Sequence, residues 1–175
     1  AILSCIEKAE AEIDAMHLLR TDLPEECVIA LRLDLHSLTL WRSAPAFSYN
    51  AWLLQQDMHE TYRMYRRLLQ YYQSQVGAKR LTLKAPMHLL GLQALLDVIP
   101  EAMIIQTHRD PLQCVPSDHK LTFAIQGGVT KGVDPKCVVE ANTRTALTMA
   151  QRSLEVSQTS QSQRICHIDY RDLVN

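Results

Sequence analysis

Three residues that could hold an anionic nucleotide stand at or just after the ends of short apolar runs. They are Lys84, Arg109 and Tyr170. Ammonium and guanidinium groups bind phosphate, the guanidinium with two parallel hydrogen bonds. A tyrosine ring offers a flat face against which a base can pack. The alternative is purely structural: Arg109 pairs with Asp110, Lys84 caps a strand end and Tyr170 belongs to the core.

Two histidines lie close to these cations in the sequence. His88 follows Lys84 by four residues, and His108 directly precedes Arg109. Because the unperturbed pKa of histidine lies near neutrality, an imidazole there could accept the proton of an acceptor hydroxyl. His88 is the stronger candidate, since it falls in the first turn of a predicted helix above the sheet. The alternative for both is ordinary packing.

Three segments with the pattern of buried strands would position these groups. They are residues 80–84, 102–106 and 164–170. Predicted helices separate them. The order strand, helix, strand, helix, helix, strand predicts an α/β fold, a parallel sheet with crossover helices. In such sheets ligands bind beyond the carboxyl ends of the strands, which is where the lysine, the arginine and the tyrosine stand.

The first part of the chain is predicted to be helix-rich. Apolar residues recur every three or four positions along residues 2–16, and a later helix is predicted to end near Gly77. We therefore expect one domain over residues 1–175, with a mainly helical part at 1–78 and an α/β part at 79–175.

Glycine and proline residues predict where the later helices begin and end. Asp134 and Pro135 have the order expected at a helix start. Gly127, Gly128 and Gly132 predict a flexible loop just before it.

The composition excludes several classes of protein. The chain has 175 residues, 47% of them hydrophobic, and a formal net charge of −1 from 18 basic and 19 acidic residues. This balance argues against disorder and against a nucleic-acid coat. No apolar run approaches the ~20 residues of a membrane span. The five cysteines form no CxxC pair, so we expect no metal site. A cytoplasmic location is favoured, and a homo-oligomer is left open.

Residues 80–111 read RLTLKAPMHLLGLQALLDVIPEAMIIQTHRDP. Two further segments, DLPEEC at 22–27 and DYRDLV at 169–174, flank this run. Together they resemble the bacterial branch of the sulfotransferase family. The resemblance covers nearly the whole chain and is most specific between Leu81 and Ser117.

The resemblance implies a P-loop NTPase-like three-layer sandwich, similar to P-loop kinases, that transfers a sulfonyl group without a metal. The donor would be 3′-phosphoadenosine 5′-phosphosulfate and the acceptor a hydroxyl or an amine. The family holds the 3′-phosphate with an arginine at a strand end and a serine eight positions later, here Arg109 and Ser117. It also implies that Tyr170 lies near the adenine and Lys84 near the sulfonyl group, with His88 as the candidate base.

One part of the family pattern has no counterpart in this sequence. The glycine-rich loop of the type PxRxGTT, which cradles the 5′-phosphosulfate, is absent. We therefore expect an interior part of a sulfotransferase domain that keeps the 3′-phosphate half of the donor site, and enzymatic activity stays uncertain. The alternative is a non-catalytic remnant that serves as a nucleotide-binding or protein-interaction module.

Overall fold

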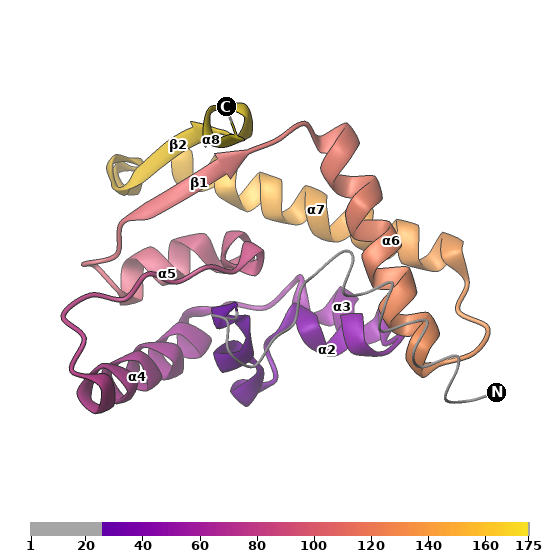
Figure 1. Ribbon diagram of the computed structural model, residues 1–175, viewed down its shortest axis with the longest axis horizontal. Coiled ribbons are helices and arrows are strands. Elements are labelled where there is room, and N and C mark those ends of the chain that lie inside the picture. The colour runs from indigo at the N-terminus through magenta and orange to yellow at the C-terminus, as the bar shows by residue number, and fades with distance from the viewer. Residues whose placement is uncertain (1–25, 175) are drawn as a thin grey trace.

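The computed structural model describes residues 26–174. Helices form most of this part of the chain, and a small sheet lies along one side of them (Figure 1). With η marking 3₁₀ helices, the elements are η1 (Cys27–Asp34), α2 (Leu38–Ser43), α3 (Phe47–Leu53), α4 (His59–Val76), η2 (Pro86–Gly91), α5 (Leu92–Val98), β1 (Ile104–His108), α6 (Pro111–Val129), α7 (Pro135–Ser157), η3 (Ser160–Arg164), β2 (Ile165–Asp169) and α8 (Tyr170–Val174).

The sheet of the described chain consists of β1 and β2, which pair in parallel. Ile104 is opposite Ile165 at one end and His108 is opposite Asp169 at the other. The connection runs through α6 and α7, so both strands point the same way and their carboxyl ends meet at one edge (Figure 1). The prediction of a parallel sheet with crossover helices is confirmed for these two strands.

The strand predicted at residues 80–84 does not form. This segment has no regular secondary structure in the described chain, and it contacts another segment through one backbone hydrogen bond, from the Cys27 N–H to the Lys84 carbonyl at 3.1 Å. Alternating side chains indicate only which face each residue would take. A strand also needs a neighbouring strand to satisfy its N–H and C=O groups. The prediction of a third strand was therefore wrong.

The hydrophobic core is formed by α4, α5, η2 and the C-terminal part of α7, together with residues of η1, α2 and α3, and α5 lies between the sheet and α4 (Figure 1). Tyr62 and Tyr65, three positions apart on α4, are buried on its inner face, as helical spacing requires. The helix ends at Gly77, whose φ of 65° is left-handed and suits glycine. This end of the helix is where the sequence predicted it.

The two long helices after β1, α6 and α7, each begin with a proline that follows an aspartate N-cap residue. The Asp110 carboxylate accepts a hydrogen bond from the Leu112 N–H at 2.9 Å, and the Asp134 carboxylate accepts one from the Lys136 N–H at 2.9 Å. Both arrangements satisfy N–H groups that the first turn leaves free. The predicted helix start at Asp134 is confirmed.

The loop predicted at Gly127 and Gly128 is helical instead, because α6 continues to Val129. One turn before its end, the buried Gln126 side chain donates to the carbonyl oxygens of Trp41 at 2.7 Å and Ala44 at 3.3 Å. This anchor holds the end of the helix against α2, so tertiary packing outweighs the low helix propensity of glycine.

Two arginines connect helix ends across the core. Arg152 of α7 donates to the carbonyl oxygens of Leu54 and Leu90, which follow α3 and lie in η2. Arg164 donates to the carbonyl oxygens of Leu96 at 2.6 Å and Pro100 at 2.8 Å, at the end of α5. A guanidinium suits this role, because its several donors reach more than one orphan carbonyl at a helix C-terminus.

The helix predicted over residues 2–16 lies outside the described residues. Within residues 26–174, no helix has both the length and the apolar character needed to cross a bilayer.

Candidate functional site

The carboxyl ends of β1 and β2 bring two of the predicted site residues into contact. Because His108 is opposite Asp169, the next residues along the two strands, Arg109 and Tyr170, emerge at the same edge. The guanidinium carbon of Arg109 lies 4.7 Å from the centre of the Tyr170 ring, a cation–π contact. Arg109 and Tyr170 belong to segments far apart in the sequence, and the pairing of β1 with β2 brings the two side chains together.

Arg109 has a polar partner but no carboxylate partner among residues 26–174. Its Nε and one terminal nitrogen each donate to Gln113 Oε1 at 3.3 Å. Asp110, the expected salt-bridge partner in the structural alternative, caps α6 instead. The charge of the Arg109 guanidinium is therefore not neutralised within the described chain, and it is exposed at the strand end.

Ser117 lies on α6, four residues after Gln113, and residues four apart share one face of a helix. Gln113 contacts Arg109, so Ser117 lies one turn farther along the helix face that begins at the arginine. The side chain is exposed. No hydrogen bond within the described chain joins it to Arg109.

Lys84 lies in the irregular segment before η2, with its ammonium group paired to the carboxylate of Glu26. Its side chain is 70% exposed. It makes no polar contact with Arg109, Ser117 or Tyr170 in the part of the chain that the structure describes. Within residues 26–174, no hydrogen bond or ion pair therefore joins the lysine to the cluster at the strand ends.

His88 is half-buried, and both of its ring nitrogens face other side chains. Nδ1 lies 2.9 Å from the Tyr62 hydroxyl, and Nε2 lies 3.2 Å from the Cys27 thiol. Burial lowers the pKa of His88 to about 4, so the ring is neutral at neutral pH. Tyr65 packs against the same ring, with centroids 5.7 Å apart.

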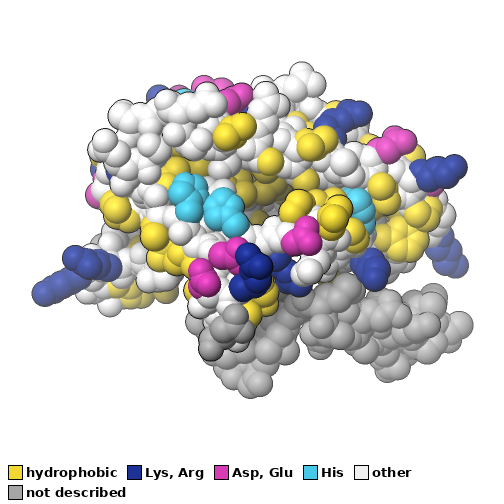
Figure 2. Space-filling model, turned by 90° about the horizontal axis from the view of Figure 1, so that it is seen from above, with side chains coloured by type: hydrophobic (Ala, Val, Ile, Leu, Met, Phe, Trp, Pro, Cys, Tyr) yellow, Lys and Arg dark blue, Asp and Glu magenta, His cyan; other side chains and the backbone are white. Residues whose placement is uncertain are grey.

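His108 pairs with His167 across the sheet rather than with Arg109. Its Nε2 lies 2.8 Å from Nδ1 of His167. On the face seen from above, histidine side chains gather beside a hollow floored by hydrophobic side chains (Figure 2). No group of three or more His, Cys, Asp or Glu residues within residues 26–174 is arranged to hold a metal ion.

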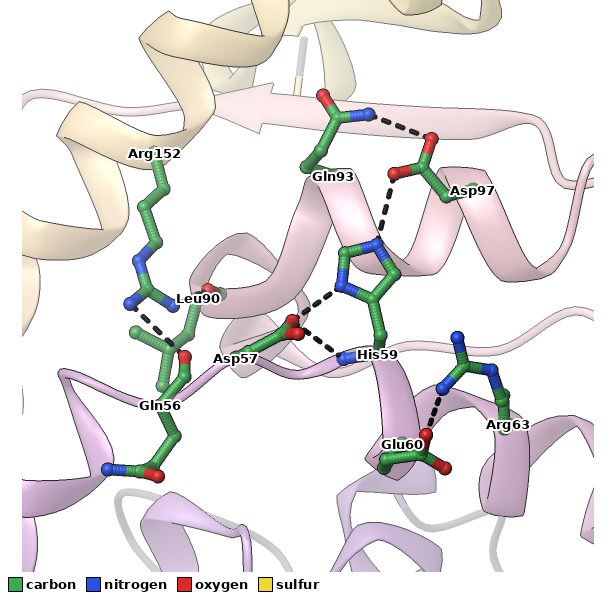
Figure 3. Close-up of polar contacts among 9 residues, drawn as sticks. All are labelled: Gln56, Asp57, His59, Glu60, Arg63, Leu90, Gln93, Asp97 and Arg152. Atoms are coloured by element: carbon green, nitrogen blue, oxygen red, sulfur yellow. Dashed lines mark hydrogen bonds and ion pairs between the residues drawn. The ribbon is translucent and has the colours of Figure 1, made fainter.

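A cavity of about 320 Å³ lies elsewhere, between residues 56–59, residues 90–94 and the end of α7. None of the five predicted site residues lines it. Beside it, the His59 ring lies between two carboxylates, with Nδ1 2.5 Å from Asp57 and Nε2 3.2 Å from Asp97 (Figure 3). These contacts join the start of α4 to α5, so the cluster belongs to the framework.

Sequence reasoning missed the partners of His88 and Lys84. Cys27 lies 61 positions before His88, so no local spacing connects them. Tyr62 belongs to an aromatic series on α4, a pattern that indicates burial but not a histidine contact. The partner of Lys84, Glu26, lies 58 positions earlier in the sequence, so no local spacing connects these two residues either.

The sequence profile described as the sulfotransferase family matches residues 3–175. The chain belongs to the sulfotransferase family. Its fold agrees with a solved member, the crystal structure of sulfotransferase STF1 from Mycobacterium tuberculosis H37Rv (type1 form), with a TM-score of 0.76 and 30% sequence identity. A search of curated proteins finds no match.

The similarity covers 96% of this chain but 49% of the STF1 chain. The sulfotransferase-family chain therefore spans about half the length of the solved structure that it matches.

Proposed function

We propose that this chain supplies the 3′-phosphate half of a site for 3′-phosphoadenosine 5′-phosphosulfate, within a P-loop NTPase-like three-layer sandwich, for sulfonyl transfer to a hydroxyl or amine acceptor. The observation that carries the proposal is the Arg109 guanidinium, which has no carboxylate partner in the described chain and lies over Tyr170 where two parallel strands end. Membership of the sulfotransferase family supports the donor class.

Each residue at this edge has a role that its chemistry suits. The Arg109 guanidinium can hold two oxygens of a phosphate with parallel hydrogen bonds. The Ser117 hydroxyl, on the helix that follows, adds a further donor. The Tyr170 ring offers its face to the adenine.

In the proposed reaction, the acceptor oxygen or nitrogen forms a bond to sulfur while the bond from sulfur to the 5′-phosphate oxygen breaks. The leaving group is adenosine 3′,5′-bisphosphate, and the acceptor releases its proton to solvent water. Negative charge grows on the bridging oxygen as that bond breaks. Lys84, exposed and held by Glu26, is the proposed cation that offsets this charge.

His88 was the candidate for the proton acceptor. A general base must present a nitrogen to the proton that it takes. Nδ1 of His88 contacts Tyr62 and Nε2 contacts Cys27, and the ring is half-buried. We therefore propose that His88 supports the structure around Lys84 and does not take the proton of the acceptor.

Calorimetric titration with adenosine 3′,5′-bisphosphate tests the proposed function. Arg109→Ala should weaken binding by about 2–3 kcal/mol, the effect of losing a charged hydrogen-bond donor. The matched control is Arg63→Ala, because Arg63 pairs with Glu60 on α4 and should leave the affinity unchanged. Equal affinities for Arg109→Ala and the unchanged chain would contradict the proposal.

A further inference from the structure

We propose that Tyr62, His88 and Cys27 form a partly buried hydrogen-bond chain that holds Lys84 in place, and that they are positioning residues for the proposed sulfonyl transfer. This inference rests on the proposed function. It starts from a juxtaposition of three elements, since Tyr62 belongs to α4, His88 to η2 and Cys27 to η1.

The chain of contacts is continuous, with the Tyr62 end buried and the Cys27 end partly exposed. The Tyr62 hydroxyl lies 2.9 Å from His88 Nδ1, and Cys27 Sγ lies 3.2 Å from His88 Nε2. Tyr62 is fully buried and His88 is packed between Tyr62 and Tyr65. A partly buried polar chain of this kind is rigid when its members satisfy one another, because a broken link leaves a polar group without water.

Counting protons assigns the tautomer of His88. The buried Tyr62 hydroxyl has Nδ1 of His88 as its hydrogen-bond partner, so its proton is satisfied only if Nδ1 accepts it. Nε2 then carries the imidazole proton and points it at the Cys27 sulfur. The opposite tautomer would leave the stronger O–H donor buried without an acceptor. All three groups are neutral in this arrangement.

Cys27 connects His88 to Lys84 through its side chain and its backbone. The Cys27 N–H donates to the Lys84 carbonyl at 3.1 Å, and the neighbouring Glu26 carboxylate pairs with the Lys84 ammonium. Lys84 lies outside helix and strand, so no ladder of backbone hydrogen bonds holds it. The contact between His88 and Cys27 therefore fixes the segment that carries both partners of the lysine.

The first test measures the hydrogen-bond chain itself, without any ligand. The ¹⁵N shifts of the His88 ring should give the Nε2–H tautomer in the unchanged chain. Tyr62→Phe removes the hydroxyl donor, and the Cys27 amide should then exchange its hydrogen about tenfold faster. Tyr72→Phe is the matched control, because Tyr72 lies on the same helix and its side chain is exposed. An Nδ1–H tautomer, or equal exchange in both variants, would overturn the inference.

The second test asks whether the chain acts through Lys84. Tyr62→Phe should weaken binding of 3′-phosphoadenosine 5′-phosphosulfate about fivefold while leaving adenosine 3′,5′-bisphosphate within about twofold. In a double-mutant cycle, the variant that carries both Tyr62→Phe and Lys84→Ala should bind the donor only slightly more weakly than Lys84→Ala alone. Additive effects would contradict positioning through Lys84.

Cys27→Ser keeps a small polar group beside His88 and serves as a second variant if Tyr62→Phe does not fold. It should retain the Nε2–H tautomer and most of the donor affinity, whereas Cys27→Val should keep the tautomer, which the Tyr62 hydroxyl sets, and lose donor affinity. Loss of the tautomer in Cys27→Ser would count against the inference. The two proposals fail separately: an unchanged affinity in Arg109→Ala ends the proposed function, while an unchanged Tyr62→Phe ends only this inference.

Discussion

A single guanidinium makes the clearest contribution to the candidate site. Arg109 stands at a strand end, lies over an aromatic ring and has no carboxylate partner in residues 26–174. Its neighbour Asp110 is committed to the first turn of α6. At an exposed site, a charge without an internal counter-ion is available to an anionic ligand at little cost in desolvation.

Tyr170 provides a prediction at the scale of one residue. If its ring packs against the adenine, Tyr170→Ala should weaken binding of adenosine 3′,5′-bisphosphate by about 1–3 kcal/mol. Tyr170→Phe keeps the ring face and should bind nearly as well as the unchanged chain. Calorimetry of the two variants decides the point, and an equal loss in both would show that the hydroxyl, not the ring, matters.

The residues of the strand ends could be predicted because the rule behind them is local. A cation or tyrosine that follows a buried strand lies at the edge where ligands bind. The contact between Arg109 and Tyr170 needed the strand register, which joins segments 61 positions apart. The partners of His88 had no such rule, since η1 and α4 reach it only through tertiary packing.

The packing of η2 against α4 leaves room for no side chain at one position. A Cβ on Gly91 would lie 2.6 Å from Tyr62 Cε2 and 2.8 Å from Met58 Cβ. The glycine therefore allows the two elements to approach closely and keeps Tyr62 within reach of His88.

Gly91→Ala should lower the free energy of unfolding by about 1–3 kcal/mol, because the added methyl group overpacks this contact. Gly127→Ala is the matched control, since no atom lies within 4 Å of its Cβ position and the residue is inside α6. That change should raise the free energy of unfolding by up to about 1 kcal/mol. Urea unfolding measures both, and equal effects of the two substitutions would contradict the packing account.

Element prediction succeeded where local signals and packing agree. Gly77 ends α4 and Asp134 begins α7 because turn conformation and capping are set by neighbouring residues. The strand at 80–84 failed because its partner strand is absent from the described chain. The loop at Gly127 failed because Gln126 anchors the helix end, a contact 85 positions away in the sequence.

Charged contacts join several helices of the molecule and contribute to its stability. Asp97 of α5 accepts hydrogen bonds from Gln93 and from His59 of α4 (Figure 3). It accepts a third from Gln161 of η3. Partial burial alone would raise the pKa of Asp97, but these hydrogen bonds outweigh it and lower the pKa. The hydrogen bonds of His59 to Asp57 and then to Asp97 raise the pKa of the histidine, and His59 lowers the pKa of Asp57.

These shifts predict how stability varies with pH. The raised pKa of His59 contributes stability that is complete below its ordinary value of 6.5 and is lost as the pH rises through the folded value. The lowered pKa values of the aspartates contribute stability above their ordinary value of 3.8 and lose it in acid. The cluster of His59, Asp57 and Asp97 is therefore most stabilising between pH 3.8 and pH 6.5.

The variant His59→Gln measures this contribution. The loss in free energy of unfolding should reach up to about 1 kcal/mol at about pH 5 and shrink at about pH 9, as expected for a solvent-exposed cluster. His119→Gln is the control, because within residues 26–174 His119 contacts the Thr143 hydroxyl and no carboxylate. A loss in His59→Gln that does not change between the two pH values would contradict the linkage.

A crystal structure with adenosine 3′,5′-bisphosphate tests most directly where the donor nucleotide binds. We expect the 3′-phosphate within about 3 Å of the Arg109 guanidinium and the Ser117 hydroxyl, with the adenine against Tyr170. A nucleotide bound in the cavity beside His59, or anywhere that leaves Arg109 without a phosphate contact, would contradict it.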